Sequence, residues 1–200
     1  GTETIVAGAS TNVAVRVFAP ANANVKVQNV NLKTPNGWLT NSAPEPIQQE
    51  NPFRPRREDA LNASFFTLTA PQVETPTKPY WTGRINPNFT FDWTDAGEAK
   101  NMAFQKPIVT AEVKLNIGGE QITIEREVEH RFADDIRGEI RRKLNVVPAA
   151  TIGLDSNLLI APVSSKPQKH RIVMTVTNNS PTELKGAGKI VVPNNGWTLS

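Results

Sequence analysis

The sequence predicts an all-β protein built as an antiparallel β-sandwich, and three observations lead to this prediction. Valine, isoleucine and threonine make up a quarter of the 200 residues, and all three favour strands. Sixteen prolines and frequent asparagines favour turns between short strands. No segment with helical periodicity is long enough to cross over between parallel strands, so the strands are expected to pair antiparallel.

The first two strands follow from local patterns. Residues 11–18 alternate three valines with polar or small residues, which indicates a strand with one buried face. A second strand is expected over 25–32. It runs into a turn at 34–37, where Pro-Asn-Gly supplies the restricted and positive φ values of a tight reversal. Trp38 follows this turn directly.

The next hundred residues alternate between loops and strands. Residues 41–58 are expected to form a loop, because four prolines among Asn, Gln and a small basic cluster cannot sustain a central strand. Alternation resumes over 65–69. A proline-marked stretch then leads to an aromatic segment over 80–93, and another loop is expected over 94–106.

The clearest hairpin joins a strand over 109–117 to a strand over 121–132. The two glycines between them, Gly118 and Gly119, suit the primed turns that connect antiparallel strands. Residues 134–144 are ambiguous, because the apolar residues are spaced as on a helix while a glycine and a basic run weaken a helix. We interpret this stretch as a linker and a strand.

The second part of the sequence repeats the first at an offset of 159 residues. The repeat predicts a strand over 171–177, a turn over 178–181 and a strand at 190–192 that enters a second Gly-Trp turn. We therefore expect one sandwich with long Pro-rich loops over 1–143 and the opening strands of a second, truncated one over 144–200. The matched pairs are Val13 with Ile172, Val15 with Met174, Val17 with Val176, Leu32 with Val191, Gly37 with Gly196 and Trp38 with Trp197.

Charge and composition exclude several classes of function. A net charge of +3 is too small for the concentrated basic face that nucleic acid requires. No stretch approaches the ~20 apolar residues of a membrane span. The absence of cysteine excludes disulfides, thiolate metal sites and cysteine nucleophiles. The chain opens on Gly1 without a signal peptide, which we expect of a piece of a longer polypeptide.

The repeat also carries a resemblance. The segment VMTVTNNSPTELKGAGKIVVPNNGW (173–197), and more weakly residues 13–38, resembles the immunoglobulin-like module attached to bacterial α-galactosidases and other secreted glycan-active enzymes. The order of four further features resembles a longer non-catalytic region downstream of some LmbE-like (PIG-L type) N-acetylglucosamine deacetylase domains. These features are Thr77-Lys78-Pro79-Tyr80-Trp81, Glu129-His130-Arg131-Phe132-Ala133-Asp134, Arg137-Gly138-Glu139-Ile140-Arg141-Arg142 and Val146-Val147-Pro148-Ala149.

The resemblance implies an immunoglobulin-like fold and a non-catalytic accessory role. Deacetylases of this type carry a His-Pro-Asp-Asp zinc motif and a distant His-x-x-His, and neither occurs here; Asp134-Asp135 lacks the preceding His-Pro pair. No catalytic residue, metal or cofactor is therefore assigned to this chain. The implied partner is a catalytic domain of the same polypeptide, and the implied location is extracytoplasmic, either periplasmic or secreted.

The alternative function is carbohydrate binding. Five of the thirteen aromatic residues lie within 80–93, and exposed rings could stack on sugar faces. Phe89, Phe91 and Trp93 share strand parity, however, which favours a buried sandwich face over a ligand platform. Trp38 and Trp197 follow equivalent turns, which indicates a structural role at the end of a sandwich. If a platform exists, its residues are Tyr80, Trp81, Arg84, Asp92 and Trp93.

Other polar groups favour ordinary surface roles. Three glutamates on one face of the 121–132 strand are explained by solvated alternation rather than by acid–base catalysis. Two aspartates and one glutamate in one loop could hold calcium, but their spacing does not match an EF-hand loop. With only two histidines an all-histidine zinc site is impossible. These groups are Glu125, Glu127 and Glu129; Asp92, Asp95 and Glu98; His130 and His170; and the offset basic clusters 54–57 and 141–143.

Overall fold

The computed structural model describes residues 2–20, 22–46, 60–78, 93–156, 158, 160 and 168–192. The chain forms two compact units, Gly1–Pro148 (unit 1) and Ala149–Ser200 (unit 2). Each unit is built from short strands, and all but one of the strand pairs are antiparallel. The predicted all-β sandwich fold is confirmed.

The first sheet of unit 1 has the order β2–β5–β4, with β2 at Ser10–Val17, β5 at Asn62–Thr69 and β4 at Leu39–Ser42. The predicted strands over 11–18 and 65–69 are confirmed. The predicted start of the loop at 41 is wrong, because β4 continues through Ser42. Those residues pair with the free edge of β5, where Ser42 lies opposite Phe66.

The second sheet has the order β3–β6–β7, with β3 at Val25–Lys33, β6 at Thr110–Ile117 and β7 at Glu120–Glu127. A β-bulge at Gln28 interrupts the register between β3 and β6. The extra residue keeps Val27 and Val30 on the same face although they are three positions apart. One face of the sheet is therefore mainly aliphatic, with Glu120 and Arg126 at the two ends of β7, and the other face is polar.

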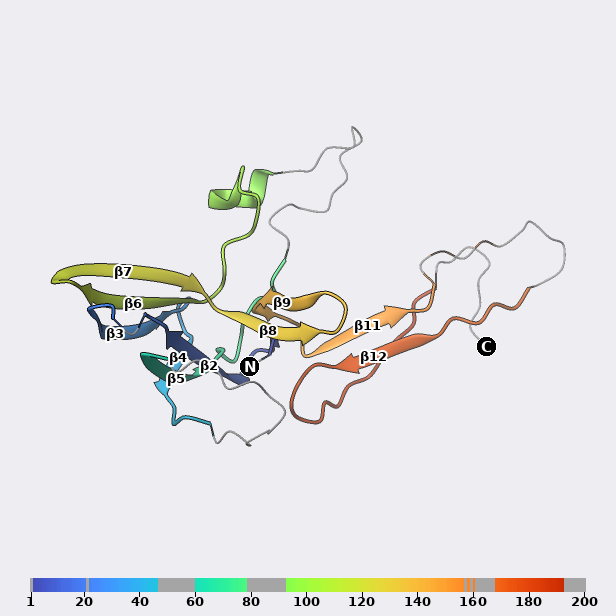
Figure 1. Cartoon of the computed structure of the whole chain (residues 1–200). Coiled ribbons are helices and arrows are strands. Elements are labelled where there is room, and N and C mark those ends of the chain that lie inside the picture. Colours follow the sequence, from blue (N-terminus) through green and yellow to red (C-terminus); the bar gives the residue numbers. More distant parts are fainter. Residues whose placement is uncertain are drawn as a thin grey trace. The chain divides into compact units, whose positions relative to one another are not determined.

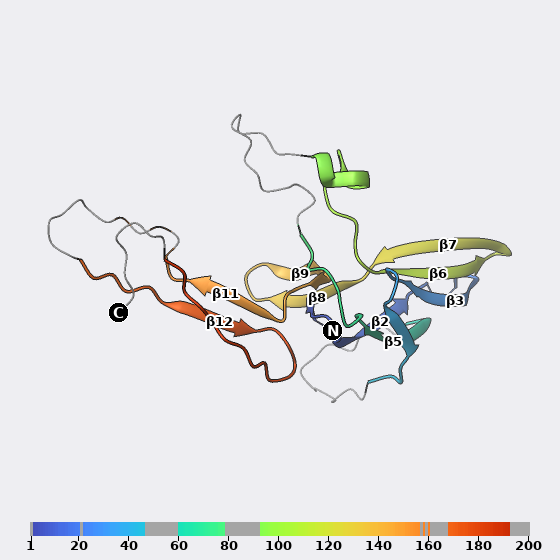
Figure 2. The ribbon, with the colours of Figure 1, turned by 180° about the vertical axis from the view of Figure 1, so that it is seen from behind.

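These two sheets form the layers of the sandwich in unit 1 (Figures 1 and 2). Apolar side chains from both layers and from the flanking segments meet in one core, which Trp38 closes beside the first sheet. The buried residues of this core are Ile5, Val13, Trp38, Leu68, Ala70, Val109, Leu144 and Val146, with Val15, Leu32, Phe66, Ile108 and Val128 packed against them.

The predicted second strand of the hairpin, over 121–132, is divided in the structure. The turn at Gly118 and Gly119 is confirmed, with φ of 61° and 105°. The strand breaks at Val128, whose N–H donates to the Val109 carbonyl at 3.1 Å. The following residues leave the sheet and form a new hairpin, β8 (Glu129–Asp134) with β9 (Gly138–Lys143), which agrees with the linker and strand expected over 134–144.

Two short elements complete unit 1. β1 (Thr4–Ile5) pairs in parallel with β10 (Asn145–Val146), so both ends of the unit lie together. A 3₁₀ helix, η1 (Thr94–Ala99), lies within the predicted loop over 94–106. Among the described residues, no helix has the length and apolar character needed to cross a membrane.

The described part of unit 2 contains one antiparallel pair, β11 (Ala150–Leu154) with β12 (Met174–Asn178). β12 confirms the later part of the strand predicted over 171–177, which begins at Met174 instead of at 171. Asn178 confirms the predicted turn, because its Oδ1 accepts from the Ser180 N–H at 2.8 Å. The strand predicted at 190–192 is wrong, since these residues are not in a strand. A strand needs a neighbour for its backbone groups, and the β6 that pairs with the first copy has no counterpart in described unit 2.

Candidate functional site

A shallow hollow of about 360 Å³ lies beside the core of unit 1. It forms where the turn before β4, the segment after β5, the approach to β6 and the strand β10 come together. The chain leaves the hollow at Lys78, just before the aromatic segment of 80–93. The lining residues are Pro35, Trp38, Glu74, Thr75, Pro76, Thr77, Lys78, Gln105, Ile108 and Val146.

Trp38 is fixed on one side of this hollow. Its side chain is only 7% exposed, and its indole N–H donates to Glu74 Oε2 at 2.7 Å. The other oxygen of the same carboxylate, Oε1, accepts the Thr75 N–H at 3.0 Å. A ring that is buried and held by a carboxylate offers little area for stacking on a sugar. The structural role predicted for Trp38 agrees with this geometry.

The floor of the hollow is held by two hydrogen bonds between Thr77 and Val146. The Thr77 N–H donates to the Val146 carbonyl at 2.9 Å, and Thr77 Oγ1 accepts the Val146 N–H at 2.9 Å. These bonds attach the segment after β5 to β10. The same segment therefore leads the chain toward the predicted aromatic site from a fixed position.

Most of the predicted carbohydrate site lies outside the described residues. This applies to Tyr80, Trp81, Arg84 and Asp92, and equally to Phe89 and Phe91. Trp93 is described: it is half-buried and precedes η1, where its carbonyl accepts the Ala96 N–H at 3.1 Å. The choice between a buried aromatic face and a ligand platform stays a prediction.

The predicted row of glutamates does not form one acidic face. Glu125 and Glu127 share the polar face of β7, but the break at Val128 moves Glu129 into β8. Lys33 lies between Glu112, at 2.8 Å, and Glu125. Hydrogen bonds to these carboxylates raise the pKa of Lys33 to about 12, and the bond from Lys33 lowers the pKa of Glu112. Glu112 is therefore stabilised as an anion rather than as a proton donor.

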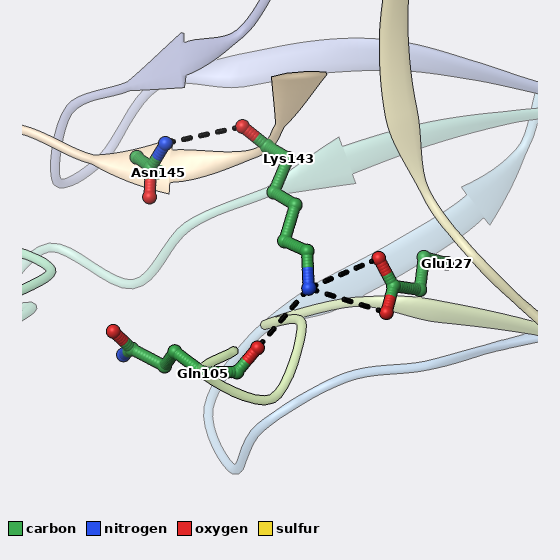
Figure 3. A network of polar contacts seen from close by, with 4 residues as sticks. All are labelled: Gln105, Glu127, Lys143 and Asn145. Carbon is green, nitrogen blue, oxygen red and sulfur yellow. Dashed lines mark hydrogen bonds and ion pairs between the residues drawn. The ribbon is translucent and has the colours of Figure 1, made fainter. Parts of the chain in front are cut away.

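Glu127 belongs to a second network, centred on Lys143 (Figure 3). The ammonium of Lys143 lies 3.2 Å from both carboxylate oxygens of Glu127 and donates to the Gln105 carbonyl at 3.1 Å. The Lys143 carbonyl accepts from Asn145 Nδ2 at 3.1 Å. One side chain thus joins β9 to β7 and to the loop that lines the hollow.

The basic cluster at 141–143 is paired residue by residue with acids. Arg141 lies 2.7 Å from Glu139, which raises the pKa of the arginine and lowers that of the glutamate. Arg142 lies 3.3 Å from Glu3. The expected charge offset is therefore made by direct contacts. The cluster at 54–57 lies outside the described residues.

The remaining candidate ligands do not gather. His130 stacks on Phe132 with ring centroids 5.7 Å apart, while His170 belongs to the other unit. Glu98 forms an ion pair with Lys106. Within the described residues, no three His, Cys, Asp or Glu side chains lie close enough together to hold a metal ion.

Sequence reasoning missed the partner of Trp38. Glu74 stands 36 residues away in the chain, in a proline-marked stretch without alternation, so no local pattern connects the two. The sequence predicts Lys143 only as a member of the basic cluster 141–143, and Glu127 only as one of three solvated glutamates on a strand face. No protein-family model, curated protein sequence or solved structure matches this chain.

Proposed function

We propose that the chain is a non-catalytic, immunoglobulin-like sandwich region of a secreted bacterial carbohydrate-active enzyme. The parent enzyme we infer is an LmbE-like N-acetylglucosamine deacetylase, whose catalytic domain would be the partner in the same polypeptide. The role of the chain is to position or dock that domain. Its location would be periplasmic or extracellular.

The observation that supports this proposal is that charged side chains form ion pairs between neighbouring strands. Lys33 bridges two glutamates from neighbouring strands, and Lys143 joins β9 to β7 and a loop. A catalytic pair of carboxylates needs environments that separate their two pKa values. In these networks each carboxylate instead contacts a lysine ammonium, and this contact lowers the pKa of Glu112. Such contacts support a scaffold that holds its strands in register.

A titration of the tryptophan indole N–H signals tests the proposal. The chain would be titrated with oligosaccharides from chitin, peptidoglycan and plant glycans, and release of acetate from the chitin oligosaccharides would be measured in parallel. We expect neither saturable shifts nor acetate. Acetate release that survives repeated purification would refute the non-catalytic role.

The alternative, a carbohydrate-binding module, predicts a different outcome of the same titration. It is favoured by one observation: the hollow with Glu74, Lys78 and Gln105 opens at the start of the aromatic segment. Saturable shifts confined to the signals of Trp81 and Trp93 would establish this alternative. Trp81→Ala should then abolish binding. Phe18→Ala serves as the control, because Phe18 is an exposed ring that does not line the hollow.

A further inference from the structure

The turn that leads into β4 carries an Asn-Gly pair in an exposed position. Asn36 and Gly37 are both exposed, as is Pro35 before them. The turn is closed by the Trp38 N–H, which donates to the Pro35 carbonyl at 3.4 Å. This distance is longer than the ~2.7–3.2 Å usual for a backbone hydrogen bond. The turn is therefore closed weakly, and the backbone at Asn36 is free to rotate.

Neither reactive group of this pair is held in place. Among the described residues, no hydrogen bond engages the side-chain amide of Asn36 or the N–H of Gly37. Gly37 has a φ of 83°, and because it lacks a Cβ its nitrogen is not shielded by a side chain. Rotation at Asn36 can therefore bring this nitrogen onto Cγ of the Asn36 side chain.

The residue after the pair closes the core of unit 1. Trp38 is only 7% exposed, and its indole N–H donates to Glu74 Oε2 at 2.7 Å. Pro35, on the other side of the pair, lines the hollow together with Trp38. A hydrogen bond weakens steeply when its distance and angle change. Any lengthening of the backbone between Pro35 and Trp38 should therefore weaken the bond to Glu74.

We propose that Asn36 is a site of spontaneous modification, at which conversion of asparagine to isoaspartate releases Trp38 from Glu74. The Gly37 nitrogen attacks Cγ of Asn36, so that a new C–N bond forms and the bond from Cγ to the amide nitrogen breaks. The proton of the Gly37 nitrogen leaves with the amide nitrogen as ammonia. The product of this step is a succinimide ring.

Water then opens the succinimide at one of its two carbonyl carbons. Opening at Cγ gives aspartate with a normal backbone. Opening at the main-chain carbonyl of residue 36 gives isoaspartate, whose backbone passes through Cβ and Cγ. Both products carry a new carboxylate, but only isoaspartate lengthens the backbone between Pro35 and Trp38. This chemistry needs no ligand or partner and is independent of the proposed function.

Incubation of the 200-residue chain at mildly alkaline pH, followed by peptide mapping, tests the proposal. The chain carries Asn195→Gln, which removes the second Asn-Gly pair of the sequence. Electron-transfer fragmentation distinguishes isoaspartate from aspartate at each position. We expect isoaspartate at position 36. Asn41, which precedes Ser42, should stay an amide, because β4 is paired with β5 and its backbone is held extended. In Asn36→Gln, position 36 should stay an amide.

Hydrogen exchange of the Trp38 indole N–H measures the structural consequence in the same samples. In the isoaspartate form we expect this exchange to be at least about tenfold faster than in the unmodified chain. Asn36→Asp is the matched control, because it introduces the carboxylate without lengthening the backbone. It should leave the exchange of the indole N–H unchanged.

Three results would overturn the proposal. The first is an intact Asn36 after an incubation that converts the asparagine of a synthetic peptide of residues 33–40. The second is isoaspartate at position 36 with unchanged exchange of the Trp38 indole N–H. The third is equally fast exchange in Asn36→Asp, because the new charge and not the longer backbone would then release Trp38.

Discussion

Units 1 and 2 contain strands of the same alternating pattern, yet among the described residues these strands are buried in unit 1 and exposed in unit 2. Val13 in β2 is 7% exposed, whereas its counterpart Ile172 is 55% exposed. The local sequence is equivalent, so alternation by itself does not create a core. What differs is the second layer: unit 1 has β3, β6 and β7, while the described part of unit 2 has only β11 and β12. An alternating strand is therefore buried only where a second layer packs against its apolar face.

The largest expected difference between the units concerns core truncation. Leu68 is fully buried, and Leu68→Ala should destabilise unit 1 by about 2–5 kcal/mol through lost burial and a residual cavity. Ile152→Ala, at a residue 66% exposed, should change the stability of unit 2 by less than about 0.5 kcal/mol. Urea unfolding followed by hydrogen exchange resolves both units. Similar losses at the two sites would contradict an open face in unit 2.

The next effect concerns the closure of the core in unit 1. Trp38→Phe removes the indole donor from Glu74 and should cost about 1.5–3 kcal/mol, the range for a hydrogen bond to a charged group. Glu74→Gln keeps an acceptor and should cost less than about 1 kcal/mol. Thermal unfolding followed by circular dichroism measures both variants. If Trp38→Phe were neutral, the bond to Glu74 would not contribute to closing unit 1.

Substituting alanine for one glycine in each unit should change the stability of the two units in opposite directions. Gly119 has a φ of 105°, so Gly119→Ala should destabilise unit 1 by about 1 kcal/mol. Gly153 lies within β11 with no neighbouring atom within 4 Å of the added Cβ. Gly153→Ala should stabilise unit 2 by about 0.5 kcal/mol, because it restricts the unfolded chain. Exchange rates of the strand amides report each change, and destabilisation by Gly153→Ala would show that its face is covered.

Local patterns predicted those parts of the fold that depend on local chemistry. The strands over 11–18, 25–32 and 65–69 were found from alternation, and the hairpin at Gly118 from the turn preference of glycine. The bulge at Gln28, the extension of β4 and the break at Val128 were not found. Each depends on which strand lies alongside, and that information is distant in the sequence. The wrong prediction of a strand at 190–192 has the same cause, because a strand there would need a neighbouring strand to pair with.

In the candidate site, too, the features that depend on local sequence were predicted and those that depend on tertiary contacts were not. The structural role of Trp38 was predicted from its repeated position after a Gly-Trp turn. Its partner Glu74 was not, because a hydrogen bond between segments 36 residues apart leaves no periodic trace. The glutamates of β7 were expected to be solvated. The lysines that pair with them were not predicted, because Lys33 and Lys143 reach them only after the sheets have assembled.

The smallest expected effect concerns the polar faces of the two units. The polar face of unit 1 carries Lys33 between Glu112 and Glu125, whereas that of unit 2 carries threonines. Lys33→Gln should lower the melting temperature slightly, because exposed ion pairs contribute little. Lys26→Gln, on the same strand, is the control and should have no comparable effect. High salt should reduce the difference between wild type and Lys33→Gln.

The pH dependence of that difference follows from the directions of the pKa shifts. The pKa of Lys33 is raised from 10.5 to about 12, so its contribution is complete below pH 10.5 and is lost as the pH rises through about 12. The pKa of Glu112 is lowered from 4.5, so its contribution is present above pH 4.5 and is lost on acidification below that value. The stability gap between wild type and Lys33→Gln should therefore be widest between these limits and close at both ends. A gap that persists unchanged in acid would mean that Lys33 acts through the packing of its aliphatic stem, and the charged polar face would then no longer distinguish unit 1 from unit 2.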